Sequence, residues 1–127
     1  MNSNDHALWN RLGASLANSK RYNEAIVAYE RALALNPTFV RGHYNMGISF
    51  MNQGQLTKAL GFMIRALELH LPVETVDVSV TDPLSTGYQS IWNTIRIIGD
   101  KMERDDASIL IEQRDIAGLK NLLKTIS

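Results

Sequence analysis

The sequence predicts an all-α fold in which two tandem helix-turn-helix repeats form a short superhelix, capped by a C-terminal helical bundle. The first observation is internal similarity, because Trp9–Gly13 aligns with His43–Gly47 at an offset of 34 residues and the match continues to Leu35 and Leu69. The second is apolar spacing typical of helices, which runs through both copies and returns near the C-terminus. Glycine and proline fall between these segments, where helices end.

The period and its recurring residues are those of the tetratricopeptide (TPR) repeat. In the first copy, the positions that the pattern fixes are Trp9, Leu12, Gly13, Leu16, Ala25, Tyr29, Ala32 and Pro37. Small residues let two antiparallel helices approach closely, and large ones fill the space around them. Leu12, Leu16, Met46 and Phe50 are therefore expected in the core. His43 replaces the tryptophan in the second copy, so we expect it to pack rather than to act chemically.

The helices divide the chain into four parts. We expect repeat helices at residues 5–19, 22–35, 39–53 and 56–69, with Asn4 or Asp5 as the first cap, so the TPR repeats span 5–37 and 38–71. Residues 72–87 are predicted to form a loop. The alternation of Val76–Val80 also fits a strand, although an isolated strand has no partner. Residues 88–127 predict the bundle, with helices at 88–102, 106–113 and beyond Asp115, the second and third capped by Asp106 and Asp115. Two repeats are fewer than a stable stack needs, so we expect the bundle to cover the open end.

Composition excludes several classes of function. The 127 residues contain 13 Lys and Arg and 13 Asp and Glu, and such a balance gives no general attraction to nucleic acid or to an anionic membrane. The absence of cysteine excludes disulfides and thiolate zinc sites. No apolar stretch is long enough for a transmembrane segment, and the first residues lack the features of a signal peptide.

No catalytic constellation is evident. The three histidines are dispersed and lack metal-ligand spacing to carboxylates. Glu103, Asp105 and Asp106 lie at a predicted helix end beside Arg104, where helix capping and solvation explain them. We therefore expect no enzymatic activity, no catalytic residue, no cofactor and no metal.

The candidate binding surface is the face of the first helix of each repeat that points away from the core. Polar residues recur there: Asn10, Arg11, Asn18, Arg41, Asn45 and Asn52. Asparagine is unfavourable inside a helix, but its amide can bond both groups of an extended peptide backbone, and arginine suits a carboxylate. A pocket for an apolar terminal side chain is expected from Ala14, Ala17, Ile48, Ser49 and Met51. The alternative, an ordinary solvated surface, stays open at this point.

Segments 4–18, 40–49 and 90–96 resemble the type 1 peroxisomal targeting signal receptors, the peroxin-5 family, in their last two TPR repeats and C-terminal helical bundle. The resemblance covers essentially the whole chain. It implies a receptor that binds the C-terminal Ser-Lys-Leu-type signal of peroxisomal or glycosomal cargo through an asparagine ladder and an arginine. Asn10, Asn18, Asn45 and Asn52 match the ladder and Arg41 the arginine, whereas Arg11 stands where relatives often have lysine.

The resemblance further implies a cytoplasmic receptor for protein import that cycles to the peroxisomal or glycosomal membrane and meets docking proteins through an N-terminal half that is missing here. Because half of the groove would also be missing, we expect weak peptide binding by this chain alone. Two alternatives remain: a TPR adaptor or co-chaperone that binds another C-terminal peptide tail, and an assembly piece that pairs through the exposed side of its first helix or through residues 76–80.

Overall fold

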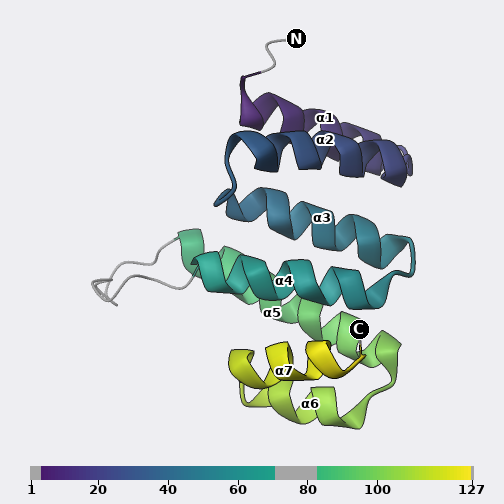
Figure 1. Cartoon of the computed structure of the whole chain (residues 1–127), viewed down its shortest axis with the longest axis vertical. Helices are drawn as coiled ribbons and strands as arrows, with labels where there is room; N and C mark the ends of the chain where they lie inside the picture. The colour runs from purple at the N-terminus through teal and green to yellow at the C-terminus, as the bar shows by residue number, and fades with distance from the viewer. Residues whose placement is uncertain (1–3, 71–82, 127) are drawn as a thin grey trace.

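The computed structural model describes residues 4–70 and 83–126, with side chains described at 4–70 and 88–126. Within these residues the fold is entirely α-helical, as predicted, and consists of stacked layers (Figure 1). The helices are α1 (His6–Asn18), α2 (Tyr22–Leu35), α3 (Val40–Asn52), α4 (Leu56–His70), α5 (Pro83–Met102), α6 (Asp105–Glu112) and α7 (Ile116–Ile126). The predicted loop or strand at Val76–Val80 lies outside the described residues.

The repeat helices begin and end within one residue of their predicted bounds. Asp5 caps α1, because its Oδ1 accepts hydrogen bonds from the backbone N–H groups of Ala7 at 3.0 Å and Leu8 at 3.4 Å. Asp115 likewise accepts from the N–H of Gly118 at 2.9 Å at the start of α7. These two caps were predicted from sequence, and both are confirmed.

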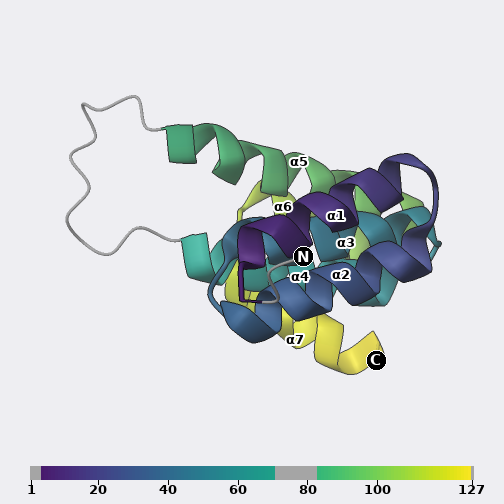
Figure 2. The same ribbon diagram turned by 90° about the horizontal axis from the view of Figure 1, so that it is seen from above.

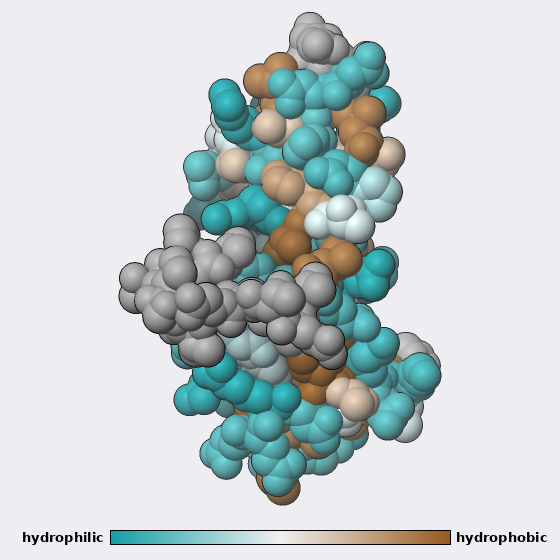
Figure 3. All heavy atoms as spheres, turned by 90° about the vertical axis from the view of Figure 1, so that its left-hand side faces the viewer, coloured by the Kyte–Doolittle hydropathy of each residue, from teal (hydrophilic) through white to brown (hydrophobic). Residues whose placement is uncertain are grey.

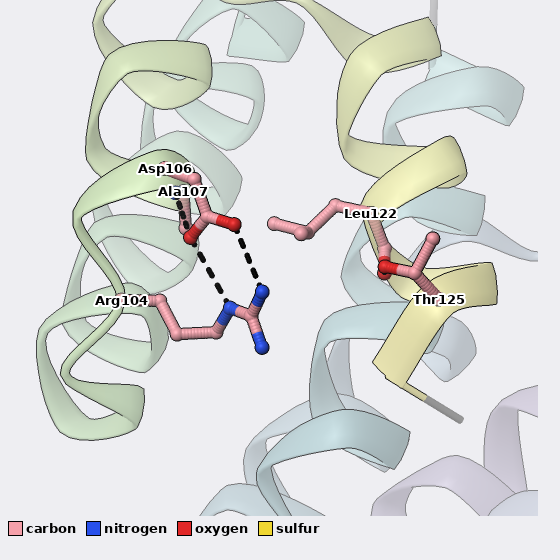
Figure 4. Close-up of polar contacts among 5 residues, drawn as sticks. All are labelled: Arg104, Asp106, Ala107, Leu122 and Thr125. Carbon is pink, nitrogen blue, oxygen red and sulfur yellow. Dashed lines mark hydrogen bonds and ion pairs between the residues drawn. The ribbon is translucent and has the colours of Figure 1, made fainter.

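Two boundaries in the bundle differ from the prediction. Helix α5 begins at Pro83 rather than Tyr88, so residues 83–87, predicted as part of a loop, are helical. Proline suits a first helical position because its fixed φ is already helical and the missing N–H would have no partner there. Helix α6 begins at Asp105, and Asp106 therefore lies inside its first turn rather than at the cap. Asp106 Oδ1 still accepts from the N–H of Ala107 at 3.0 Å (Figure 4).

Close approach of the paired helices depends on two glycines. A Cβ on Gly13 would lie 2.4 Å from Tyr29 Cε1, and one on Gly47 would lie 2.6 Å from Met63 Cε. Both glycines are buried, and so are the two partners. Burial also raises the pKa of the Tyr29 phenol, since a phenolate would be poorly solvated there.

One predicted core residue is not in the core. Leu12 is 38 % exposed, whereas Met46, its equivalent in the second repeat, is 3 % exposed. Met46 packs against Ala25, Ile26 and Tyr29 of α2. No described helix precedes α1, so Leu12 lacks the layer that Met46 contacts. Leu16 and Phe50 are half-buried and pack against the core as expected.

The largest core joins the second repeat to the bundle. Buried residues of α4 form one cluster with Ile91, Trp92, Ile95 and Ile98 of α5 and with Leu119 of α7. Figure 2 shows α5 on one side of the stack and α7 on the other. Lys120 of α7 also pairs with Glu68 of α4 at 3.0 Å. The bundle therefore packs on α4, the last helix of the repeats.

The surface is mostly polar on the side drawn in Figure 3, where hydrophobic areas are small and separated by hydrophilic ones. In the part of the chain that the structure describes, no helix has the length and apolar content to cross a membrane. The same residues contain no group of three acidic, histidine or cysteine side chains able to hold a metal ion.

Candidate peptide-binding surface

Two of the predicted asparagines meet across neighbouring helices. Asn45 Nδ2 on α3 donates to Asn10 Oδ1 on α1 at 2.9 Å, and both side chains are half-buried. This bond fixes the planes of both amides. A side-chain amide has an NH2 group that donates and an oxygen that accepts. The Nδ2 group of Asn10 and the Oδ1 atom of Asn45 can therefore still form hydrogen bonds. The pair thus keeps one donor group and one acceptor, the two kinds of group that bond the backbone of an extended peptide.

The other polar candidates lie toward the ends of the same helices. Asn18 and Asn52 are the last residues of α1 and α3, and both are exposed. Arg41 lies in the first turn of α3, is exposed, and forms no ion pair with any described residue. Arg11, on α1, is also exposed. These side chains therefore form a line along the helices rather than one compact cluster.

The length of that line matches a short extended peptide. Arg41 and Asn52 are separated by eleven helical positions, or roughly 16 Å at 1.5 Å per residue. An extended chain covers this distance with about five residues at roughly 3.3 Å each. A peptide tail of this length can form main-chain hydrogen bonds with the amides along the line. It can also make a charged contact at one end.

The predicted pocket residues differ in exposure. Ala14, Ala17, Ile48 and Met51 are half-buried, and the last two pack against the core that joins the second repeat to the bundle. Ser49 is only 1 % exposed, and its Oγ has no partner among the described residues. One helical step turns a side chain by about 100°, so Ser49 lies inside while its neighbour Ile48 reaches the surface. This burial argues against the surface lining role that sequence suggested for Ser49.

Helix α5 packs beside α3, a contact that sequence reasoning missed. Thr94 Oγ1 donates to the Ser90 carbonyl at 2.9 Å, and the Tyr44 hydroxyl lies 3.3 Å from the same Oγ1. The contact joins α3 to α5, as the asparagine pair joins α1 to α3. Ile97, three residues further along α5, is 46 % exposed. The repeat period gave no signal for this contact, because the segment before α5 interrupts it.

His43 has the packing role that its position predicted. Its Nε2 lies 2.8 Å from the Pro37 carbonyl oxygen, to which it donates, and its ring centroid lies 6.1 Å from that of Phe62. Its Nδ1 is buried and has no partner among the described residues. The histidine thus ties the turn after α2 to helix α4.

Comparison with known proteins agrees with the fold. A family model described as a TPR repeat matches residues 13–54. The chain is 43 % identical over 107 residues to the peroxisomal targeting signal receptor of Saccharomyces cerevisiae, a match that covers 84 % of this chain and 18 % of the relative. The receptor of the same name from Candida albicans is 44 % identical over 108 residues, covering 85 % and 18 %.

A third relative is more similar over a shorter stretch. The peroxisomal targeting signal receptor of Candida glabrata is 54 % identical over 70 residues, which is 55 % of this chain and 12 % of that protein. The chain therefore spans less than a fifth of the length of these relatives. Identity of this degree over most of the chain, together with the TPR fold, places it in the family of peroxisomal targeting signal receptors.

Proposed function

We propose that this chain supplies part of a groove that binds the C-terminal Ser-Lys-Leu-type targeting signal of peroxisomal cargo proteins. The observation that carries the proposal is the Asn10–Asn45 pair across α1 and α3, with the exposed Arg41 on the same helix as Asn45. The amides bond the peptide backbone, which every cargo shares. The guanidinium of Arg41 takes the terminal carboxylate, which only a chain end supplies.

The apolar side chains beside this line supply selectivity for the last residue of the signal. Ala14 and Ala17 on α1 and Ile48 and Met51 on α3 are half-buried, so each keeps some surface for contact. A leucine side chain that covers such surface loses contact with water, at about 25 cal/mol per Å² of apolar area buried. In this proposal Ser49 supports the pocket from inside and does not touch the peptide.

The names of the relatives support a wider role as a receptor for targeting signals. As a receptor for targeting signals, the whole protein would bind cargo in the cytoplasm and cycle to the peroxisomal or glycosomal membrane. Docking proteins of the import machinery would meet it through parts outside this chain. Because this chain corresponds to a small share of the relatives, the isolated chain is expected to bind the signal weakly.

The test is a chimeric receptor in which this chain replaces the matching stretch of the Saccharomyces cerevisiae protein. A fluorescent peptide ending in Ser-Lys-Leu is titrated against the chimera and its Asn45→Ala and Arg41→Ala variants. Each variant loses a hydrogen bond to a desolvated or charged group, worth about 1.5–3 kcal/mol, and should bind roughly ten-fold more weakly or worse. Asn121→Ala and Arg31→Ala, exposed on α7 and α2, are the matched controls.

Amidation of the peptide C-terminus distinguishes the carboxylate contact from general attraction. The amidated peptide should bind weakly to the unaltered chimera, and Arg41→Ala should weaken it little further. Equal affinity of all variants for the free-acid peptide would reject the proposal. Stronger binding of an acidic chaperone tail than of the Ser-Lys-Leu peptide would instead identify a TPR adaptor or co-chaperone.

A further inference from the structure

A second candidate site lies on α4, formed by residues to which the proposed peptide groove gives no role. It is an open groove of about 470 Å³, lined by His43, Thr57, Lys58, Gly61, Phe62, Arg65, Leu123 and Lys124. Helices α4 and α7, which form most of it, pack against each other in the lower half of the molecule (Figure 1). Lys58, Gly61, Phe62 and Arg65 follow helical spacing and therefore share one face of α4.

The floor of the groove is apolar and held in place. The Phe62 ring stacks on Phe50 with centroids 5.5 Å apart at an interplanar angle of 17°. Leu123 of α7 closes the other side. Between them Gly61 has no side chain, and a Cβ there would touch only Leu123 Cδ2 at 3.5 Å, an ordinary contact. The absence of a side chain at Gly61 thus keeps the groove open.

The rim is cationic. Lys58 and Arg65 are exposed, and neither forms an ion pair with any residue that the structure describes. Lys58 Nζ lies 5.5 Å from the centroid of the Phe50 ring. Lys124 of α7 also lines the groove, and none of the described lining residues carries a carboxylate. The positive charges of Lys58 and Arg65 beside an apolar floor favour a ligand that is acidic and also has an apolar side chain.

The first repeat does not share this combination of an open apolar floor and a cationic rim. At the repeat offset, Gly61 corresponds to Val27 and Lys58 to Glu24. Val27 fills the equivalent place on α2, and Glu24 is paired with Arg21 there. The second repeat alone therefore combines an open floor with unbalanced positive charge.

We propose that the α4–α7 groove docks an acidic peptide segment of a partner protein, with one aromatic or leucine side chain on the floor and carboxylates on the cationic rim. Its volume is in the range of small-ligand pockets and holds a few side chains. A polyanion such as nucleic acid would need a longer basic stripe, and the chain as a whole is electrically balanced. The site differs from the asparagine surface in its helices and needs no terminal carboxylate.

The test uses the 127-residue chain and a fluorescein-labelled, C-terminally amidated peptide, Glu-Asp-Glu-Phe-Leu-Asp-Glu-Asp. Amidation keeps the probe from acting as a targeting signal. Fluorescence anisotropy should show binding that weakens with added salt. The Lys58→Glu/Arg65→Glu variant should bind at least about tenfold more weakly, because attraction between opposite charges at the surface is replaced by repulsion. Gly61→Leu should also abolish binding by filling the floor, without lowering the melting temperature.

The matched control is Arg96→Glu/Lys101→Glu on α5, which changes the net charge equally at exposed positions outside the groove and should bind like the unaltered chain. A probe with serine in place of Phe-Leu should bind weakly. Absence of binding by the acidic aromatic probe, or equal binding by both double variants, overturns the proposal. So does tighter binding of a single-stranded oligonucleotide or an anionic vesicle at the same site.

Discussion

At the scale of single residues, the paired helices approach each other where a glycine faces a large side chain. Gly13 faces the ring of Tyr29, a planar group that cannot bend, whereas Gly47 faces the terminal methyl of Met63, which can rotate away. The same position in the repeat therefore has different tolerance in the two copies. A sequence pattern that only requires glycine does not reveal this difference.

We predict that Gly13→Ala lowers the free energy of unfolding more than Gly47→Ala. Overpacking against the Tyr29 ring costs about 1–3 kcal/mol, and the better helix propensity of alanine returns about 1 kcal/mol. For Gly47→Ala the methionine moves, so the two effects should nearly cancel. Urea unfolding followed by circular dichroism measures both. Gly61→Ala, whose Cβ meets only an ordinary contact, is the control and should stabilise. A larger loss at Gly47 would contradict the prediction.

The sequence predicted residue roles well where they follow from the repeat alone. Gly13, Tyr29 and the packing of His43 on Phe62 belong to this group, since each depends on a partner inside one repeat. Burial of Leu12 was predicted wrongly, and the depth of Ser49 was not predicted, because both depend on the layers on either side of a helix. The Asn10–Asn45 bond is intermediate: the shared face was predicted, but the contact needed the crossing of α1 and α3.

At the scale of elements, local polar contacts lie at the ends of the bundle helices. Arg104 lies just before α6, and its guanidinium donates to both carboxylate oxygens of Asp106, from Nε at 3.2 Å and from Nη2 at 2.8 Å (Figure 4). Thr125 similarly donates to the Leu122 carbonyl at 2.7 Å near the end of α7. The hydrogen bond and charge of Arg104 hold the pKa of Asp106 below its usual value.

This contact predicts an acid-sensitive contribution to stability. Because the folded-state pKa of Asp106 is lowered, its contribution is complete above the unfolded-state pKa, about 4, and is lost as the pH falls through the folded value. Asp106→Asn should therefore be slightly less stable than the unaltered chain at pH 7, and the difference should shrink at pH 3. Urea unfolding at both pH values measures it. Arg104→Gln should reduce the pH dependence of the difference, leaving the part due to the backbone N–H of Ala107, and a difference unchanged by pH would argue that the ion pair contributes nothing.

The order and type of the described helices were predictable, because apolar spacing and caps are local signals. The start of α5 was not, since the residues before Tyr88 carry no apolar periodicity, and a proline can end a helix as well as begin one. The role of α5 beside α3 was also not predictable. It depends on the Tyr44–Thr94 contact between residues 50 positions apart, which no repeat relates.

At the scale of the whole molecule, the two repeats are supported unequally. The second repeat is covered by α2 on one side and by the bundle on the other, and the buried residues of α4 join one extended core. The first repeat contributes to a smaller cluster of Ala25, Ile26, Tyr29 and Met46. In a stack where each layer contacts only its neighbours, stability is roughly the sum of the layers and their interfaces. The outer layer should therefore open first.

The equivalent residues Leu12 and Met46 test this gradient directly. Met46→Ala removes a side chain that is 3 % exposed and should lower the free energy of unfolding by about 2–5 kcal/mol. Leu12→Ala removes one that is 38 % exposed and should lower it by about 1 kcal/mol or less. Urea unfolding at two protein concentrations gives both values and detects self-association. Hydrogen exchange should also be faster in α1 than in α4. Equal losses that grow with concentration would mean that Leu12 is buried against a second copy of the chain, as the assembly alternative requires.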